Sequence, residues 1–436
     1  MDILDDERYP VPAAPHGATG VAWLRSHVVR FSEGEERRRR RALTTQLLAA
    51  VPPEVLRRPG HPVATLAEAL GLPRDVTRDV ETVAACYHPH TPVTPGSDEA
   101  VGRLVAAAGG RWDEVTAARI GLLVQACAAT RAAVRGDDPA VPTTRRVTPG
   151  GDEVLVDLTG LPFGSGRHAC PGVEHAHALV DGARTFARLH AGPEPLLLPN
   201  AWDVGSALVL VEAGFAAIGT TSLGVAAAHG LPDGAGATRA ETLALARRLA
   251  RLPVPVSVDV EAGFGGDVAE LAAELTTMGV AGINLEDGRD GGLADVGTQA
   301  ALVEAVKRVA PELFVNARID THWLGVDRHD TARRAAAYVE AGADGVFVPG
   351  LRDEREIAAQ VEALGDVPLN LLSQLPLARL RDLGVRRVST GSALVRTALT
   401  QGVRAATAYR DGQDLPAAMP YDALSGLLDR WSGTEG

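Results

Sequence analysis

The second half of the chain alternates short apolar runs with longer amphipathic stretches. Each run is rich in Val, Ile, Leu or Ala, and the stretch after it has helical spacing that often stops at Gly or Pro. We find eight such runs: 196–199, 216–220, 256–260, 282–285, 313–317, 345–348, 369–372 and 387–389. Eight strand and helix pairs in about 200 residues predict a parallel (β/α)8 barrel. A doubly wound open sheet is the alternative, although neither GxGxxG nor GxxxxGK follows the first run.

The first 190 residues lack this regular alternation. Helical stretches such as 31–44 and 120–134 are separated there by segments rich in Pro and Gly. We therefore expect two domains, a mostly helical one over residues 1–190 and the barrel over residues 191–436.

Acidic residues and an arginine lie directly at the ends of three predicted strands. Asp259 and Glu261 stand in VSVDVEAGFG, Glu286 and Asp287 in GINLEDG, and Arg318 in FVNARIDTHW. Because the carboxyl ends of barrel strands meet at one face, these side chains should gather there. Carboxylates suit Mg²⁺ and a guanidinium suits a carboxylate, so the pattern predicts a site for a hard cation and an anionic substrate. The alternative is a salt-bridged barrel rim.

Lysine is nearly absent from the chain, and this restricts the chemistry. Among 43 basic residues, Lys307 is the single lysine, and it lies in a helical pattern between two predicted strands. Cleavage of a 2-oxo acid through a Schiff base needs a desolvated lysine at the site. Any enolate chemistry in this barrel is therefore expected to rest on a metal.

Charge, cysteine content and hydropathy exclude several other classes of protein. The net charge of −12 argues against general binding to nucleic acid. Three widely spaced cysteines support neither a disulfide framework nor a zinc cluster. The acidic start MDILDDERYP and the lack of an apolar run of roughly 18 residues give no sign of a membrane segment. We expect a cytoplasmic protein.

Residues 195–400 resemble the isocitrate lyase and phosphoenolpyruvate mutase superfamily. The resemblance lies in LLLPNAWDVGSALVLVEAGF, AIGTTSLGVAAAHGLPDG, VSVDVEAGFG, GINLEDG and NARIDTHWLG. It implies a site dependent on Mg²⁺ (or Mn²⁺) that stabilises the enolate of a 2-oxo acid while a bond at C3 is made or broken. By matching position, Asp259, Glu261 and Glu286 would hold the metal directly or through water.

The same resemblance assigns roles around the metal. Thr221 and Ser222 would bind the substrate carboxylate, and Arg318 would bind the enolate oxygen or that carboxylate. Asp233 would close the site from its loop, so that Arg318, Asp233 and Glu286 form the expected catalytic set. The local alternatives are a helix N-cap for Thr221 and Ser222 and a turn former for Asp233.

Two departures from the family pattern narrow the expected reaction. The lyase members carry a Lys-Cys-Gly-His loop where this chain reads DGRDGGLAD, and no cysteine lies in the barrel half. Pro349 stands where the mutase members have a histidine. We therefore expect a lyase or hydrolase that cleaves a C–C bond, and less readily a P–C bond, of a small 2-oxo or 2-hydroxy acid.

The segment FGSGRHACPG, residues 163–172, resembles the cysteine-ligand loop of haem-thiolate cytochrome monooxygenases. That resemblance implies Cys170 as a haem ligand in a truncated monooxygenase-like domain over residues 1–190, and the alternative is a free or buried thiol without haem. Two other functions therefore stay open: a haem-thiolate oxidase or haem-binding module with the barrel as scaffold, and a pseudoenzyme that serves assembly. Residues 404–436 could pair copies, and we expect a dimer or tetramer.

Overall fold

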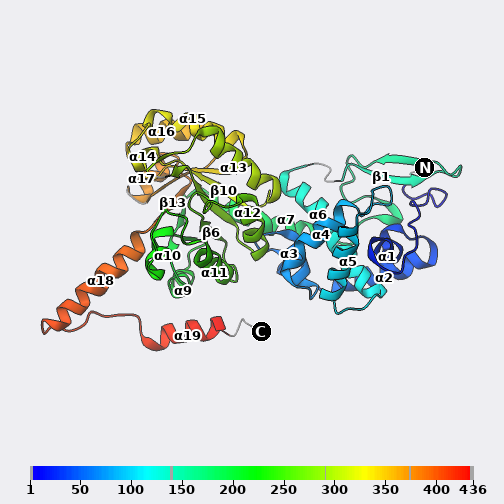
Figure 1. Cartoon of the computed structure of the whole chain (residues 1–436), viewed down its shortest axis with the longest axis horizontal. Coiled ribbons are helices and arrows are strands. Elements are labelled where there is room, and N and C mark those ends of the chain that lie inside the picture. The colour runs from blue at the N-terminus through cyan, green and yellow to red at the C-terminus, as the bar shows by residue number, and fades with distance from the viewer. Residues whose placement is uncertain (1–2, 138–140, 290, 373–374, 433–436) are drawn as a thin grey trace. The chain divides into compact units, whose positions relative to one another are not determined.

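The computed structural model describes every residue except 1–2, 138–140, 290, 373–374 and 433–436 (Figure 1). The chain divides into two compact units. Unit 1 comprises residues 1–185 with 277–279, and unit 2 comprises residues 186–276 with 280–436. The boundary lies a few residues before the expected position near 190, because Phe186 and His190 are buried and pack with the barrel residue Phe314.

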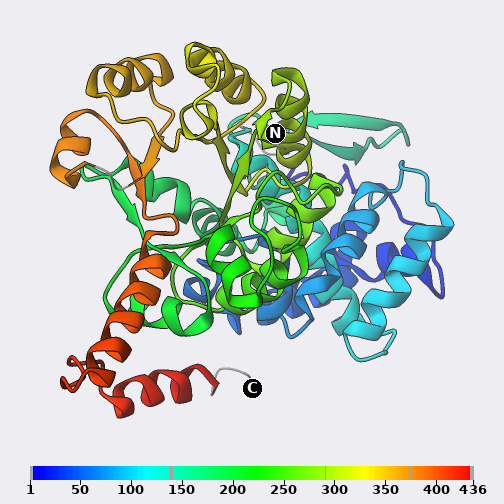
Figure 2. The same ribbon diagram turned by 60° about the vertical axis from the view of Figure 1, so that its left-hand side comes forward.

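Unit 1 is mostly helical, as predicted, and also contains a two-stranded antiparallel hairpin, visible beside its helices in Figure 2. The hairpin strands are β1 (Thr143–Val147) and β2 (Glu153–Asp157). The main helices are α1 (Gly20–His27), α2 (Gly34–Ala49), α3 (Pro62–Ala69), α4 (Thr77–Ala85), α5 (Pro95–Ala107), α6 (Glu114–Arg135) and α7 (Val173–Ala183).

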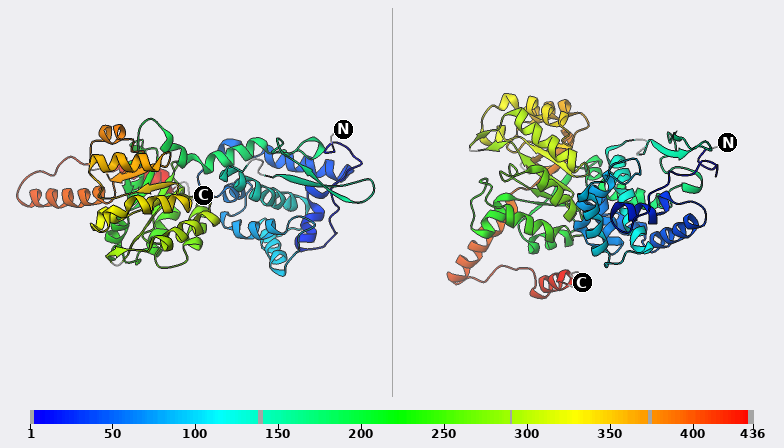
Figure 3. Two further views of the ribbon diagram at one scale, coloured as in Figure 1. Left: turned by 90° about the horizontal axis from the view of Figure 1, so that it is seen from above. Right: turned by 45° about the vertical axis from the view of Figure 1, so that its right-hand side comes forward.

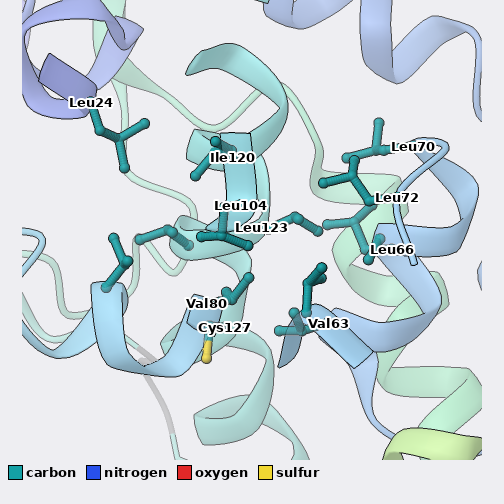
Figure 4. Packing of buried hydrophobic residues seen from close by; sticks show 14 of the residues in the cluster. Leu24, Val63, Leu66, Leu70, Leu72, Val80, Leu104, Ile120, Leu123 and Cys127 are labelled. Atoms are coloured by element: carbon teal, nitrogen blue, oxygen red, sulfur yellow. The ribbon is translucent and has the colours of Figure 1, made fainter. Parts of the chain in front are cut away.

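Helix α6 forms the centre of the unit 1 core. Asp113 caps its start by accepting a hydrogen bond from the Thr116 backbone, and Gly136 ends it with a φ of 92°. Its buried Ile120 and Leu123 belong to one apolar cluster with Leu104 and with residues of α3 and α4 (Figure 4). By length and composition α6 could cross a membrane, but half of its apolar window is buried inside the protein, as in a core helix.

Unit 2 contains a closed barrel of parallel strands. Nine strands follow the order β3-β13-β12-β11-β10-β7-β6-β5-β4, and β3 and β4 are two parts of one strand interrupted at Pro199. All eight predicted runs form strands: β3 (Leu196–Leu198) with β4 (Asn200–Ala201), β5 (Ile218–Thr220), β6 (Val256–Asp259), β7 (Gly282–Glu286), β10 (Phe314–Arg318), β11 (Gly345–Phe347), β12 (Leu369–Leu372) and β13 (Arg387–Ser389). This arrangement confirms the predicted barrel over the open sheet.

Helices surround the strands of unit 2 (Figure 1). They are α8 (Thr185–Arg188), α9 (Val204–Glu212), α10 (Ser222–His229), α11 (Arg239–Leu249), α12 (Val268–Met278), α13 (Val296–Val309), α14 (Thr321–Leu324), α15 (Thr331–Glu340), α16 (Glu354–Leu364) and α17 (Leu377–Asp382). A short hairpin, β8 (Gly288–Arg289) and β9 (Gly292–Leu293), follows β7. The C-terminal helices α18 (Ala393–Arg410) and α19 (Tyr421–Ser432), orange and red in Figure 3, are largely exposed.

The barrel interior changes character along the strands. An apolar floor is made by Phe186, Phe314 and Leu198, and Gly282 leaves room there for the Phe186 ring. Above the floor lies a polar layer in which the side-chain amide of Asn316 donates to Asn284 Oδ1 at 2.8 Å. Because side chains two positions apart along a strand share a face, the next residues in register form the upper end of the barrel.

Candidate active site

The upper end of β7 and β10 carries a close carboxylate and guanidinium pair. Arg318 and Glu286 are paired across the two strands, and Arg318 Nη1 lies 2.6 Å from Glu286 Oε2. The side chains are only 15% and 11% exposed, so the pair is shielded from water. The strand register thus brings together two of the residues that the sequence singled out.

Asp320 completes this cluster, and sequence reasoning missed it. Arg318 Nε donates to Asp320 Oδ1 at 2.7 Å, and Asp320 is 2% exposed. Gly288 makes room for the carboxylate, because a Cβ built there would lie 2.4 Å from Asp320 Oδ2. The available signal was a second acidic residue two positions after the arginine in NARID, with a glycine directly after the LED segment.

Asp259 is held at the end of β6 by backbone and side-chain contacts. Its carboxylate accepts hydrogen bonds from the backbone N–H groups of Ser222 at 3.3 Å and Glu261 at 3.2 Å. Its own backbone N–H donates to the Thr220 hydroxyl at 2.9 Å. The chain before α10 therefore orients Asp259, and Ser222 contributes through its backbone.

The charged groups at this end of the barrel shift one another's pKa values. Burial raises the pKa of Glu286 to about 8, although the Arg318 charge acts to lower it. The neighbouring Asp259 and Asp320 carboxylates add to the rise. Burial also raises the pKa of Asp259 and of Asp320, and again Arg318 opposes it. Burial acts to lower the pKa of Arg318, but the carboxylates around it raise it above its ordinary value. More carboxylate is gathered here than one guanidinium neutralises.

Glu261 is buried, but its carboxylate is engaged elsewhere. Oε2 accepts from the Gly236 backbone N–H at 2.8 Å, and Oε1 accepts from the Thr238 hydroxyl at 2.7 Å. These donors belong to the segment between α10 and α11, which also contains Asp233. Glu261 therefore differs from Asp259 and Glu286 in its partners, because both of its hydrogen-bond donors belong to the segment between α10 and α11.

Asp287 has a structural position rather than a place in the cluster. It is fully buried and accepts hydrogen bonds from Arg334 at 3.0 Å and from the Tyr338 hydroxyl at 2.8 Å. Its other oxygen accepts the backbone N–H of Asp320 at 2.9 Å. It ties α15 to the strand ends and fixes the backbone that carries Asp320.

The remaining expected residues lie around the same end of the barrel. Thr221 is buried and stands at the N-cap position of α10 without a side-chain capping bond, so its hydroxyl is not used as a cap. Asp233 is exposed, and its charge is close enough to contribute to the raised pKa of Asp259. The exposed turn position of Asp233 suits either a turn former or a group that approaches the site.

The donor chemistry at this end of the barrel suits a hard divalent cation. Asp259 and Glu286 are carboxylates with raised pKa values, and a bound cation would favour their charged forms. Within the described ranges, however, no three His, Cys, Asp or Glu side chains form a group that could hold a metal ion. The metal set Asp259, Glu261 and Glu286 stays a prediction: Glu261 bonds to Gly236 and Thr238, and its charge also adds to the raised pKa of Glu286.

Cys170, the expected haem ligand, is an exposed free thiol in unit 1. Its sulfur accepts the Gly172 backbone N–H at 3.4 Å, and Arg30 and Arg41 lie within electrostatic range. Nearby, His168 lies 3.2 Å from Glu33. The loop thus places the thiol in a basic environment.

Comparisons with known proteins concern unit 2. The phosphoenolpyruvate phosphomutase family matches residues 186–410. An uncharacterized protein of Mycobacterium tuberculosis is 45% identical over 248 residues, which cover 56% of this chain and 96% of that one. A 2-methylisocitrate lyase of Bacillus subtilis is 35% identical over 206 residues, 44% of this chain and 67% of the lyase.

A further relative and a solved structure agree with that match. An oxaloacetate decarboxylase of Pseudomonas aeruginosa is 34% identical over 236 residues, 50% of this chain and 77% of the decarboxylase. A protein of Burkholderia cenocepacia, provisionally assigned as a lyase/mutase, has a crystal structure that superposes with a TM-score of 0.52. It is 35% identical, and the match covers 57% of this chain and 95% of that one. The chain therefore belongs to the phosphoenolpyruvate phosphomutase family, within the isocitrate lyase superfamily.

Proposed function

We propose that unit 2 is a Mg²⁺-dependent (or Mn²⁺-dependent) lyase or hydrolase that cleaves a C–C bond of a small 2-oxo or 2-hydroxy acid. The observation that carries the proposal is the cluster of Asp259, Glu286 and Arg318 at the carboxyl ends of β6, β7 and β10. Two relatives with named activities, a 2-methylisocitrate lyase and an oxaloacetate decarboxylase, support chemistry at a C–C bond.

In this proposal Asp259 and Glu286 would hold the metal, which would supply Lewis-acid polarisation of the substrate's keto oxygen. Arg318 binds the enolate oxygen or the carboxylate as negative charge develops, because its guanidinium is already fixed by Glu286 and Asp320. Thr221 and Ser222 bind the substrate carboxylate, Ser222 through its hydroxyl, because its backbone N–H donates to Asp259. Asp233 approaches from its exposed loop and helps to exclude water.

C–C cleavage is favoured over migration of a phosphoryl group. Pro349 stands where the mutase members have a histidine, and the loop between β7 and α13, which contains the hairpin of β8 and β9, is short. The same loop lacks the cysteine of the lyase members, which argues against a tricarboxylate substrate. Small acids whose bond breaks next to the enolate carbon need fewer distant contacts than a tricarboxylate substrate. We therefore propose an oxaloacetate-like or methylmalate-like acid as the first substrate class to assay.

The test is product release from a panel of acids with and without Mg²⁺. We expect pyruvate or a related product from an oxaloacetate-like or methylmalate-like acid, with methylisocitrate-like and phosphonopyruvate-like compounds as comparison substrates, and loss of that activity in Glu286→Gln. The matched control is Glu304→Gln, an exposed glutamate on α13. No product from any compound at saturating Mg²⁺ would refute the proposal.

A second candidate function, in unit 1, is haem-thiolate binding at Cys170. The exposed thiol, the donated Gly172 N–H and the nearby arginines favour it, because a thiolate and the acidic groups of haem both suit a basic loop. The test is an absorption spectrum of the purified protein and of Cys170→Ala. A Soret band that shifts under carbon monoxide and is lost in the variant supports haem. Its absence in the wild-type protein sinks the idea.

We also propose that the protein is a cytoplasmic homo-oligomer, paired through α18. Along this helix Leu399, Val403 and Tyr409 are each at least 60% exposed, which is unusual for apolar side chains on a monomer. Light scattering should give a dimer or tetramer, and Leu399→Glu with Val403→Glu should shift it towards monomer. If this protein forms the oligomer but cleaves none of the acids in the panel, a pseudoenzyme that serves assembly is favoured instead.

A further inference from the structure

Glu261 stands apart from the other carboxylates because both of its oxygens are used by a loop from an earlier part of the chain. The Gly236 backbone N–H donates to Oε2 at 2.8 Å, and the Thr238 hydroxyl donates to Oε1 at 2.7 Å. Glu261 is 3% exposed, and Thr238 is fully buried. Charge-assisted hydrogen bonds in such a dry environment are strong, so they hold the loop firmly.

The backbone at Glu261 is also unusual. Its φ is 50°, in the left-handed region that a residue with a Cβ rarely adopts, and Phe264 three residues later has a φ of 58°. The backbone is held in this conformation at both polar groups: the carbonyl accepts the Glu286 N–H at 3.0 Å, and the N–H donates to Asp259 Oδ1. A strained conformation that is fixed by several contacts commonly marks a functional position.

The loop held by Glu261 covers residues 231–238 and packs against this same turn. At Gly236, which has a φ of 69°, a Cβ would lie 3.4 Å from Phe264 Cα, so the two backbones approach closely. The loop carries Asp233, whose charge reaches Asp259. The contacts that fix residues 231–238 therefore also fix the distance between Asp233 and the carboxylate cluster.

We propose that Glu261 is a positioning residue that fastens the 231–238 loop beside the site, and that it is not a metal ligand. Both oxygens of Glu261 already accept a hydrogen bond, so a cation at Glu261 would have to share them with Gly236 and Thr238. Its length matters, because a carboxylate one methylene shorter could not span both donors. This inference rests on the proposed function, because that function makes the carboxylate cluster a metal site. The contacts of Glu261 with Gly236 and Thr238 do not depend on it.

Three substitutions distinguish a positioning residue from a metal ligand. Glu261→Gln removes the charge but keeps length and hydrogen bonding, since an amide can accept from Gly236 and donate to the Thr238 oxygen. Glu261→Asp keeps the charge but loses the reach. Thr238→Val removes one donor and leaves every carboxylate in place. Thermal unfolding first establishes that each variant is folded.

The measurements are hydrogen exchange of residues 231–238 and calorimetric titration with Mn²⁺. In Glu261→Asp and Thr238→Val we expect exchange of the loop to rise about tenfold, because a charge-assisted hydrogen bond is lost, while exchange in the barrel strands stays unchanged. In Glu261→Gln loop exchange should rise less than in those two variants, because both hydrogen bonds persist without the charge, and the Mn²⁺ dissociation constant should stay within about threefold of wild type.

The opposite pattern would overturn the inference. If Glu261→Gln weakened Mn²⁺ binding by about tenfold or more while Glu261→Asp kept wild-type loop exchange, Glu261 would be a ligand. The exchange measurement needs neither metal nor substrate. A wild-type protein that bound no Mn²⁺ would therefore refute the proposed function, and loop exchange alone would then decide the role of Glu261.

Discussion

Unit 1 and the barrel of unit 2 fill their interiors with opposite kinds of side chain. The helical unit packs Leu, Ile and Val around α6, whereas the barrel places Asn284, Asn316 and Arg387 above a small apolar floor. An apolar core stabilises by removing surface from water, while a buried polar layer gains little net stability. The barrel thus uses part of its interior to support charged groups, and the two interiors should respond differently to substitution.

The largest effect is expected at the top of the barrel. Arg318→Ala removes the guanidinium that lies between Glu286 and Asp320, so kcat/KM for the acid found in the substrate panel should fall by about 10³. The exposed Arg308→Ala on α13 serves as the control and should keep wild-type activity. A loss smaller than about tenfold would mean that Arg318 belongs to a structural rim.

Truncation in the apolar core of unit 1 comes next. Leu123 is fully buried on α6, and Leu123→Ala should lower the free energy of unfolding of unit 1 by about 2–5 kcal/mol through lost burial and a new cavity. Leu155→Ala on β2, where the side chain is 57% exposed, should change it by less than about 0.5 kcal/mol. Chemical denaturation followed by circular dichroism measures both. Equal effects of the two substitutions would contradict a tightly packed apolar core around α6.

The next effect concerns pH. Because the pKa of Glu286 is raised to about 8 in the folded protein, the metal-free folded state holds more protons than the unfolded state between pH 4.5 and 8. The free energy of unfolding should therefore fall as pH rises through this window, by up to about 1.4 kcal/mol per pH unit. Thermal unfolding from pH 5 to 8 checks this, and Glu286→Gln should flatten the slope. An unchanged slope in the variant would assign it to other groups.

The smallest effect is expected in the polar layer of the barrel. Arg387 is 1% exposed, its Nη1 has no hydrogen-bond partner, and burial lowers its pKa to about 9. Arg387→Met removes a costly buried charge, while Asn284 Oδ1 keeps its bond from Asn316. The free energy of unfolding of the barrel should stay within about 1 kcal/mol or rise. A loss of more than about 3 kcal/mol would show that the polar layer stabilises the fold.

The fold of the barrel could be predicted because its signal is local and repeated. Each apolar run, such as 282–285, is long enough for a strand and is separated from the next by a helical stretch, and all eight runs form strands. The positions of Asp259, Glu286 and Arg318 followed from the rule that strand ends share one face. The hairpin of β1 and β2 gave a weaker signal, because the buried residues of β1, Thr144 and Arg146, are polar and β2 alternates between exposed and partly buried residues.

Other parts of the site depend on contacts between segments that are distant in the sequence. The direction of the Glu261 side chain depends on hydrogen bonds from Gly236 and Thr238, more than 20 residues earlier. It also depends on a left-handed backbone conformation that no residue pattern predicts. Asp320 is brought to Arg318 by a turn whose geometry depends on Asp287. Sequence reasoning could identify the residue types but not these bonds.

The most direct test of the central claim is anomalous diffraction at the manganese edge from crystals soaked in Mn²⁺. We expect one strong peak in contact with the carboxylates of Asp259 and Glu286, with Glu261 still bonded to Gly236 and Thr238. No peak at this end of the barrel, with the salt bridge of Arg318 and Glu286 unchanged, would contradict a metal-dependent site in unit 2.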